Sequence, residues 1–201
     1  MAGEPSAACI AVGSELLGDE RLDRNSLTIT RTLAKHGIPV VEKRVVGDSI
    51  EAIAGAISEL LDRVDVLVVT GGLGPTADDV TREAVARAVG RPLEHNTEVE
   101  EWVRARYEEH GRDMPELCRR MAQVVRGARP LPNARGAAPG LLLSVRDRLL
   151  AVLPGVPGEM EQMLAAEVEP EMAVRSPGAR RCSRTLLLGG VFESAVEERI
   201  R

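Results

Sequence analysis

The chain has 201 residues, of which 44% are hydrophobic and 28% are charged, proportions typical of a globular protein with a substantial core. Its formal net charge of −5 argues against sequence-independent nucleic-acid binding, which requires a basic face. No signal-peptide pattern opens the chain, and no apolar run approaches the roughly 20 residues of a membrane span. Three scattered cysteines without a CxxC pair indicate free thiols in a reducing compartment. We therefore expect a cytoplasmic protein without a nucleic-acid or membrane partner.

Strand and helix patterns alternate along the first part of the chain. Residues 8–12 form a short apolar run that ends at Gly13, and residues 26–36 show helical spacing. A less buried strand over 40–46 and an amphipathic helix over 48–61 follow. This order is typical of βαβ units.

The strand predicted over residues 65–70 is apolar on both faces, as a central parallel strand should be. The alternation then continues with a helix over 80–90, two helices between 96 and 125, two strands joined by a polar turn at 146–148, and a helix around 159–167. Thr97 and Glu100 are expected to form a capping box.

Alternation of this kind predicts a three-layer α/β/α, Rossmann-like domain with a mostly parallel sheet over residues 1–175. Residues 176–201 are predicted to be a linker and the incomplete start of a second small α/β module. The sequence over residues 184–201 predicts one strand, a turn and the first turns of a helix.

Four unusual loops flank the predicted strands. They are "GSELLGDERLDRN" at 13–25, "TGGLGPTADD" at 70–79, "PNARGAAPG" at 132–140 and "PGVPGEM" at 154–160. Ligands of open parallel sheets bind beyond the carboxyl ends of the strands. The first, second and fourth loops follow strands and are expected to meet at one edge of the sheet. The third loop precedes a strand, so its position at that edge is the weakest of the four expectations.

The second loop combines glycines with acids. Gly71, Gly72 and Gly74 allow positive φ and close backbone approach, so their N–H groups and the following helix start predict a phosphate or pyrophosphate site. The loop is neither a Walker A sequence nor GxGxxG. Asp78 and Asp79 then fit two interpretations, a helix cap or a divalent-metal site beside the phosphates.

Asp48 has the same ambiguity, and Glu15 is a separate candidate for the site. Asp48 follows a strand and opens a capping-box pattern, which by itself favours a cap. Glu15 lies just past the first strand, where a buried acid needs a ligand or a backbone N–H.

The motif "TGGLGPTADDVT" resembles the signature of the CinA (competence/damage-inducible) amino-terminal domain, within the wider MoaB/MogA-like molybdopterin-binding fold. "GSELLG", "PNARGAAPG" and "LPGVPGEM" match further motifs of that family in the expected order, and the similarity covers roughly residues 8–172. Asp23-Arg24-Asn25 stands where the family usually has Asp-Thr-Asn.

The resemblance implies a homodimer or larger homo-oligomer and two candidate activities. One is metal-dependent hydrolysis of ADP-ribose to AMP and ribose 5-phosphate. The other is binding of molybdopterin or a related pterin phosphate, and in that branch two functional acids match Asp48 and Asp79. A non-catalytic oligomerising domain is a third interpretation.

The first hypothesis is a hydrolase that acts on a diphosphate bond. Its expected catalytic residues are Asp79, Asp78 and Asp48, with Asp78 and Asp79 as ligands of Mg²⁺, Mn²⁺ or Co²⁺. The expected substrate-binding residues come from the four loops: Gly13, Ser14, Glu15, Asn25, Thr70, Gly71, Gly72, Leu73, Gly74, Pro75, Thr76, Asn133, Gly136, Pro139, Gly140, Pro154, Gly155, Pro157 and Glu159.

Overall fold

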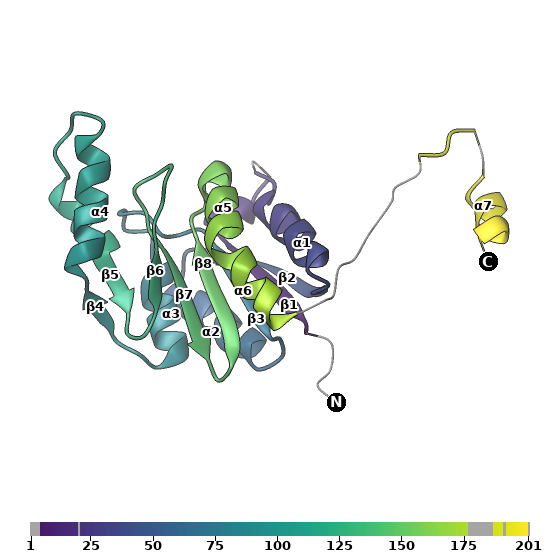
Figure 1. Ribbon diagram of the computed structural model, residues 1–201, viewed down its shortest axis with the longest axis horizontal. Helices are drawn as coiled ribbons and strands as arrows, with labels where there is room; N and C mark the ends of the chain where they lie inside the picture. The colour runs from purple at the N-terminus through teal and green to yellow at the C-terminus, as the bar shows by residue number, and fades with distance from the viewer. Residues whose placement is uncertain (1–4, 20, 177–186, 191, 201) are drawn as a thin grey trace.

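The computed structural model describes residues 5–19, 21–176, 187–190 and 192–200 (Figure 1). The strands are β1 (Ala7–Val12), β2 (Val40–Val46), β3 (Val66–Thr70), β4 (Leu93–His95), β5 (Gln123–Val125), β6 (Arg129–Leu131), β7 (Gly140–Val145) and β8 (Arg148–Leu153). The helices are α1 (Asn25–Lys35), α2 (Ile50–Leu61), α3 (Thr81–Val89), α4 (Thr97–Glu108), α5 (Pro157–Met163), α6 (Glu169–Arg175) and α7 (Glu193–Ile200). Two 3₁₀ helices, η1 (Ser14–Leu16) and η2 (Glu116–Ala122), and a π-helical segment, η3 (Leu164–Val168), complete the elements.

The main sheet has six strands in the order β2-β1-β3-β8-β7-β6. The pairs from β2 through β8 are parallel, whereas β7 runs antiparallel to both β8 and β6. The mostly parallel sheet of the prediction is confirmed. A separate antiparallel pair, β4 and β5, lies beside it.

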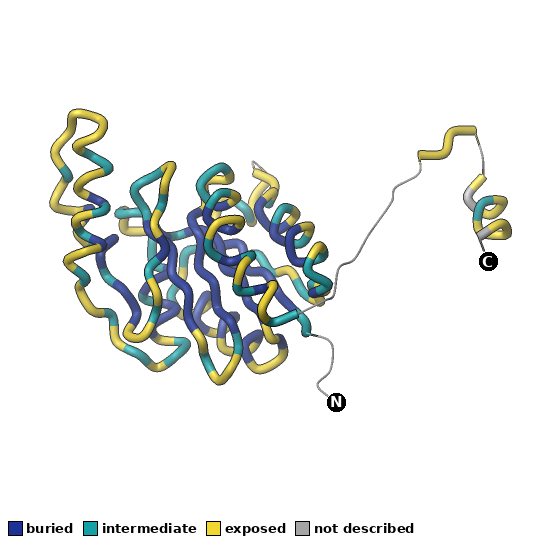
Figure 2. Tube along the Cα trace, viewed as in Figure 1, coloured by how far each residue is buried: buried dark blue, intermediate teal, exposed yellow. Residues whose placement is uncertain are grey.

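Successive residues of the central strands serve opposite faces of the sheet. In β3, Val66 and Val68 belong to a core cluster with residues of α1, α5 and α6, whereas Leu67 and Val69 pack in a second cluster with residues of α2 and α3. Figure 2 shows these strands as the buried centre between the two helical layers. Because helices cover both faces, a central strand must be apolar at every position.

Two predictions between residues 96 and 125 are wrong in detail. Asn96 caps α4, because its Oδ1 accepts a hydrogen bond from the N–H of Val99 at 3.1 Å, so Thr97 is the first helical residue and forms no capping box. The second expected helix is the 3₁₀ helix η2, and the chain then enters β5. Asparagine at the N-cap satisfies a free helix N–H without help from Thr97.

The predicted hairpin is confirmed between β7 and β8. Arg146 and Asp147 form its two-residue turn with φ of 49° and 67°, and Arg148 already belongs to β8. Near the carboxyl terminus, α7 matches the predicted helix, while the strand expected before it lies partly outside the described residues. Of the helices described, none is long and apolar enough to cross a membrane.

Candidate functional site

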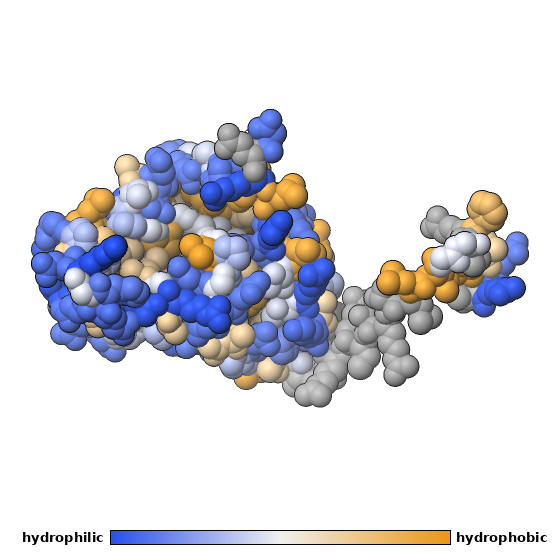
Figure 3. Space-filling model, turned by 90° about the horizontal axis from the view of Figure 1, so that it is seen from above, coloured by the Kyte–Doolittle hydropathy of each residue, from blue (hydrophilic) through white to orange (hydrophobic). Residues whose placement is uncertain are grey.

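A hollow of about 900 Å³ lies at the edge of the sheet where the parallel strands end. Figure 3 views the molecule from this side. Residues of all four unusual loops line the hollow, including the third, whose placement the sequence left open. The reason is the reversed direction of β7, since Leu141 near its start pairs with Val152 near the end of β8. The loop before β7 therefore joins the loops that follow the parallel strands.

Most of the predicted site residues line this pocket. They are Gly13, Glu15, Asn25, Asp48, Thr70, Gly71, Gly72, Leu73, Gly74, Pro75, Asp78, Asp79, Pro154, Gly155, Pro157 and Glu159. The others are not among the lining residues: Ser14, Thr76, Asn133, Gly136, Pro139 and Gly140. All of these except Gly140 take part in hydrogen bonds that hold the loops in place, and Gly140 is held by close packing.

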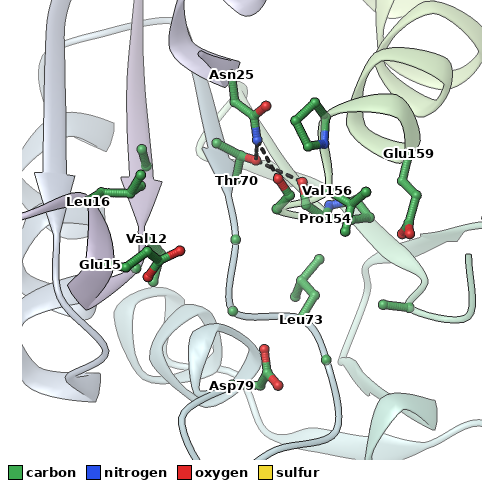
Figure 4. A pocket seen from close by; sticks show the side chains of 18 of the residues that line it. Val12, Glu15, Leu16, Asn25, Thr70, Leu73, Asp79, Pro154, Val156 and Glu159 are labelled. Carbon is green, nitrogen blue, oxygen red and sulfur yellow. Dashed lines mark hydrogen bonds between the residues drawn. The ribbon is translucent and has the colours of Figure 1, made fainter. Parts of the chain in front are cut away.

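The third loop is organised by Asn133. Its amide Nδ2 donates to the carboxylate of Glu159 at 2.7 Å, and its Oδ1 accepts from the N–H of Gly136 at 2.8 Å. Gly140 packs so closely that a Cβ there would collide with the sulfur of Met163. The role of these residues is therefore to fix the loop and to orient Glu159, which points into the pocket from α5 (Figure 4).

A buried arginine side chain lies close to the pocket without being part of its lining. Arg82 on α3 is 3% exposed and donates, within the described structure, one long hydrogen bond of 3.4 Å to the carbonyl of Pro139. Burial lowers the pKa of Arg82 to about 10. The guanidinium remains charged at neutral pH and lies near Glu83 and Asp79, whose negative charges favour its protonated form.

Asn25 joins three segments at the centre of the site. Its Nδ2 donates to Thr70 Oγ1 at 3.0 Å and to the carbonyl of Gly155 at 2.8 Å, and Thr70 Oγ1 donates in turn to the carbonyl of Pro154 at 2.8 Å (Figure 4). The carbonyl of Gly155 can only accept, and the Thr70 hydroxyl accepts because its own proton goes to the carbonyl of Pro154. The amide nitrogen of Asn25 is therefore the donor in both bonds. Oδ1 of Asn25 is buried and has no partner in the described structure. A donor on a ligand would satisfy it.

The glycine loop provides free backbone donors. The N–H groups of Gly72, Leu73 and Gly74 make no hydrogen bond within the described residues, whereas that of Gly71 donates to the carbonyl of Leu153 at 3.0 Å. Gly71 therefore cannot contribute an N–H to an anion site, contrary to the prediction. Its φ of 106° explains why glycine is required there, as does the collision that a Cβ would make with the carbonyl of Val12. The three free donors suit phosphate oxygens.

Asp79 closes the loop rather than starting the helix. Its Oδ2 accepts hydrogen bonds from the N–H of Thr76 at 2.9 Å and from its hydroxyl at 2.6 Å, whereas α3 begins two residues later, after Val80. The expectation that Asp78 or Asp79 caps α3 is therefore wrong. Asp78 is exposed, and Asp79 is half-buried with Oδ1 making no hydrogen bond in the described structure.

Arg120 of η2 fixes this acidic turn from the side. It donates to the carbonyls of Thr76 and Asp79, the latter at 3.1 Å, and to the carboxylate of Glu83 at 2.8 Å. A planar guanidinium can bridge several acceptors at once. The backbone around Asp79 is thus held by a side chain that lies about 40 residues further along the sequence.

Asp48 is also not a helix cap. Ser49 is the N-cap of α2, and its hydroxyl accepts from the N–H of Ala52 at 3.4 Å. The Asp48 carboxylate instead accepts from the N–H of Ser14 at 2.9 Å, and the Asp48 N–H donates to the Ser14 hydroxyl at 3.1 Å. This reciprocal pair joins the first loop to the β2–α2 loop and leaves Asp48 in the pocket lining.

The charged lining of the pocket is mostly acidic. Its carboxylates are Glu15, Asp23, Asp48, Asp78, Asp79 and Glu159, and its cations are Arg21 and Arg24. A diphosphate in such a pocket requires a cation to offset the repulsion. No three Asp, Glu, His or Cys side chains of the described residues form a complete metal-binding cluster. The donor set therefore fits an ion that takes one or two carboxylates and completes its shell with phosphate oxygens and water, as Mg²⁺ does.

Several lining residues were not predicted. The clearest are Tyr107 and Met121, from α4 and η2, with Ala137 and Ala138 from the third loop. Tyr107 OH and Cys118 Sγ lie 3.1 Å apart in a hydrogen bond that raises the pKa of the Tyr107 phenol. No sequence motif indicates that α4 contributes to the pocket. Tyr107 is therefore recognised as a lining residue only once the packing of α4 in the fold is known.

The fold and this pocket together define a Rossmann-like α/β/α domain with a large pocket at the carboxyl edge of the sheet. Residues 8–174 match the family model described as "Probable molybdopterin binding domain". The chain belongs to this family and, with the relatives below, is a domain of the CinA amino-terminal, MoaB/Mog-like type.

Two curated relatives are similar to almost the whole chain. A "Putative competence-damage inducible protein" from Symbiobacterium thermophilum is 42% identical over 198 residues, which cover 97% of this chain and 46% of the relative. A "CinA-like protein" from Solibacter usitatus is 42% identical over 196 residues, covering 96% and 47%. The chain thus spans about half the length of these relatives.

Solved structures agree with this assignment. The crystal structure of CinA, a protein "with unknown function" from Thermoplasma acidophilum, is 34% identical, with a TM-score of 0.78 over 83% of this chain and 98% of that one. The molybdopterin biosynthesis enzyme MoaB from Thermus thermophilus is 19% identical, with a TM-score of 0.57 over 88% and 99%. The second likeness shows the fold alone.

Proposed function

We propose that the protein is a metal-dependent pyrophosphatase that hydrolyses ADP-ribose to AMP and ribose 5-phosphate. The observation that carries the proposal is the glycine loop, where three free backbone N–H groups lie beside Asp78 and Asp79 in one pocket. Donors for phosphate next to carboxylates suit a diphosphate bound together with a divalent cation. The volume of about 900 Å³ accommodates a ligand with two sugars and a base.

The groups of the chain have distinct parts in this reaction. The N–H groups of Gly72, Leu73 and Gly74 would bind phosphate oxygens, and Oδ1 of Asn25 would accept from a ribose hydroxyl. Asp79, with Asp78 or Asp48, would hold Mg²⁺, Mn²⁺ or Co²⁺, which supplies charge neutralisation to the phosphates and activates water. Water adds to one phosphorus, the P–O–P bond breaks, and the bridging oxygen leaves with the other phosphate.

The test uses ADP-ribose with each metal in turn, with AMP and ribose 5-phosphate followed by chromatography. We expect metal-dependent release of both products and its loss in Asp79→Asn, which keeps an oxygen acceptor for Thr76 and so keeps the loop. Asp62→Asn is the matched control, because Asp62 lies on the surface in an ion pair with Arg146 at the β7–β8 turn. Equal loss in both variants, or full turnover by Asp79→Asn, would contradict the proposed role.

A second candidate is a binder of molybdopterin or a related pterin, which the description of the matching family favours. This function predicts quenching of pterin fluorescence on binding without hydrolysis of ADP-ribose. A stable homodimer or larger assembly, measured by light scattering, with affinity for neither ligand would instead favour an oligomerising domain.

A further inference from the structure

The pocket has an apolar wall at the end formed by α4. We define this wall as Tyr107, Met121, Ala137 and Ala138, which all line the pocket. The same four residues belong to one small hydrophobic cluster, whose buried members include Met121 and Cys118. The wall therefore combines segments that are distant in the sequence, α4, η2 and the third loop, into one continuous apolar surface.

Tyr107 carries the only aromatic ring in the described lining of the pocket. Of the other two aromatic residues of the chain, Trp102 packs against the larger core cluster, and Phe192 follows the domain and is exposed. The hydrogen bond between the Tyr107 hydroxyl and Cys118 fixes the far end of the ring. A ring held in this way can bind a flat heterocycle with little loss of side-chain freedom.

The order of the sheet places this wall at a useful distance from the glycine loop. The loop follows β3, whereas the third loop lies between β7 and β6, two to three strands further along. Neighbouring strands are about 4.8 Å apart, so the third loop lies roughly 10–14 Å along the sheet from the glycine loop. The η2 side of the wall lies closer, since Arg120, next to Met121, donates to the Thr76 carbonyl. A ribose and a base can span this distance from a phosphate on the glycine loop.

We propose that Tyr107, backed by Met121, is the platform on which the heteroaromatic base of the nucleotide stacks when its phosphates lie on the glycine loop. The inference rests on the proposed nucleotide function and assigns the adenylate half of the substrate to the α4 end of the pocket. The ribose 5-phosphate half then lies toward α1, where Asn25 has its unpaired oxygen. Figure 1 shows α4 and α1 at opposite ends of the sheet.

Calorimetry with AMP and ribose 5-phosphate, each with Mg²⁺, tests this assignment on the full chain. Tyr107→Leu keeps an apolar side chain but removes the ring, and Tyr107→Phe keeps the ring but loses the bond to Cys118. We expect Tyr107→Leu to weaken AMP binding about tenfold or more, as for loss of a base-stacking ring. Tyr107→Phe should bind AMP within about threefold of the wild type, and all three proteins should bind ribose 5-phosphate equally.

Four results would overturn the inference. These are equal AMP affinity in wild type and Tyr107→Leu, equal weakening of AMP in the Leu and Phe variants, parallel loss of ribose 5-phosphate, and no AMP binding by the wild type. Neopterin monophosphate is the probe for the alternative ring, and dependence of its binding on Tyr107 with AMP unaffected would also overturn the assignment. Hydrolysis of ADP-ribose is measured separately, so either proposal can fail without the other.

Discussion

Arg120 connects η2 to the turn that contains Asp79, and under the proposed function this connection would make it a positioning residue. Its guanidinium holds two carbonyl oxygens of the turn and the Glu83 carboxylate together. A lysine has a single ammonium and cannot reproduce the planar fork. These bonds hold the backbone of the turn and not the Asp79 carboxylate itself, so Arg120, which does not line the pocket, would act on Asp79 through the backbone.

We expect Arg120→Ala to lower metal-dependent turnover about 10-fold to 100-fold, the usual effect of losing a residue that orients a metal ligand. The metal concentration for half-maximal turnover should rise, which a purely structural role would not change in a protein that remains folded. Arg120→Lys should recover only part of the loss.

The neighbouring Arg119→Ala is the control for Arg120, because the Arg119 side chain is half exposed and pairs with Glu116 and Glu100 rather than with the turn that contains Asp79. It should retain wild-type turnover and metal dependence. If the two alanine variants behave alike, Arg120 has no specific part in positioning Asp79.

At the scale of elements, the start of α2 separates a capping residue from a residue that lines the pocket. Ser49 accepts the helix N–H, whereas Asp48 faces the pocket and pairs with Ser14. Ser49→Ala should therefore lower the free energy of unfolding by about 0.5–1 kcal/mol, since its capping bond is long, and leave turnover unchanged. Urea unfolding and the ADP-ribose assay measure the two effects.

Asp48→Asn is expected to show the opposite pattern, with reduced turnover and nearly unchanged stability, because the amide oxygen can still accept from Ser14 N–H. Full turnover by Asp48→Asn, or an equal loss of turnover in Ser49→Ala, would contradict this separation of the two residues. The adjacent pair thus separates helix capping from pocket lining, whereas the sequence pattern by itself favours Asp48 as the cap.

These helix starts also show where sequence reasoning reaches its limit. A capping pattern identifies the region of a helix start but does not say which of several small polar residues accepts the bond, so the pattern predicts Asp48 and Thr97 where the structure has Ser49 and Asn96. The glycines and acids of the β3 loop were recognisable because their conformational and chemical demands are local. The hydrogen bonds of Arg120 join residues that lie about 40 positions apart, and no local sequence pattern indicates them.

At the scale of the whole molecule, the direction of one strand decides the composition of the pocket. Alternation of strands and helices predicted the parallel part of the sheet, but the direction of β7 depends on its hairpin with β8. That hairpin brings Asn133 toward Glu159 and places Ala137 and Ala138 in the lining. Tyr107 joins them only because α4 and η2 pack together at this end, a contact that follows from the assembled fold.

The boundary of the domain leads to the last prediction. Both main core clusters end at or before Met172, counting the residues that the structure describes, and the family match ends at residue 174. A chain that stops after Ser176 should therefore unfold in one cooperative transition with the same urea midpoint as the full chain. It should also bind AMP equally well, because the described pocket lining ends at Glu159. A lower midpoint would show that residues beyond 176 complete the domain, and weaker AMP binding at an unchanged midpoint would show that they contribute to the site.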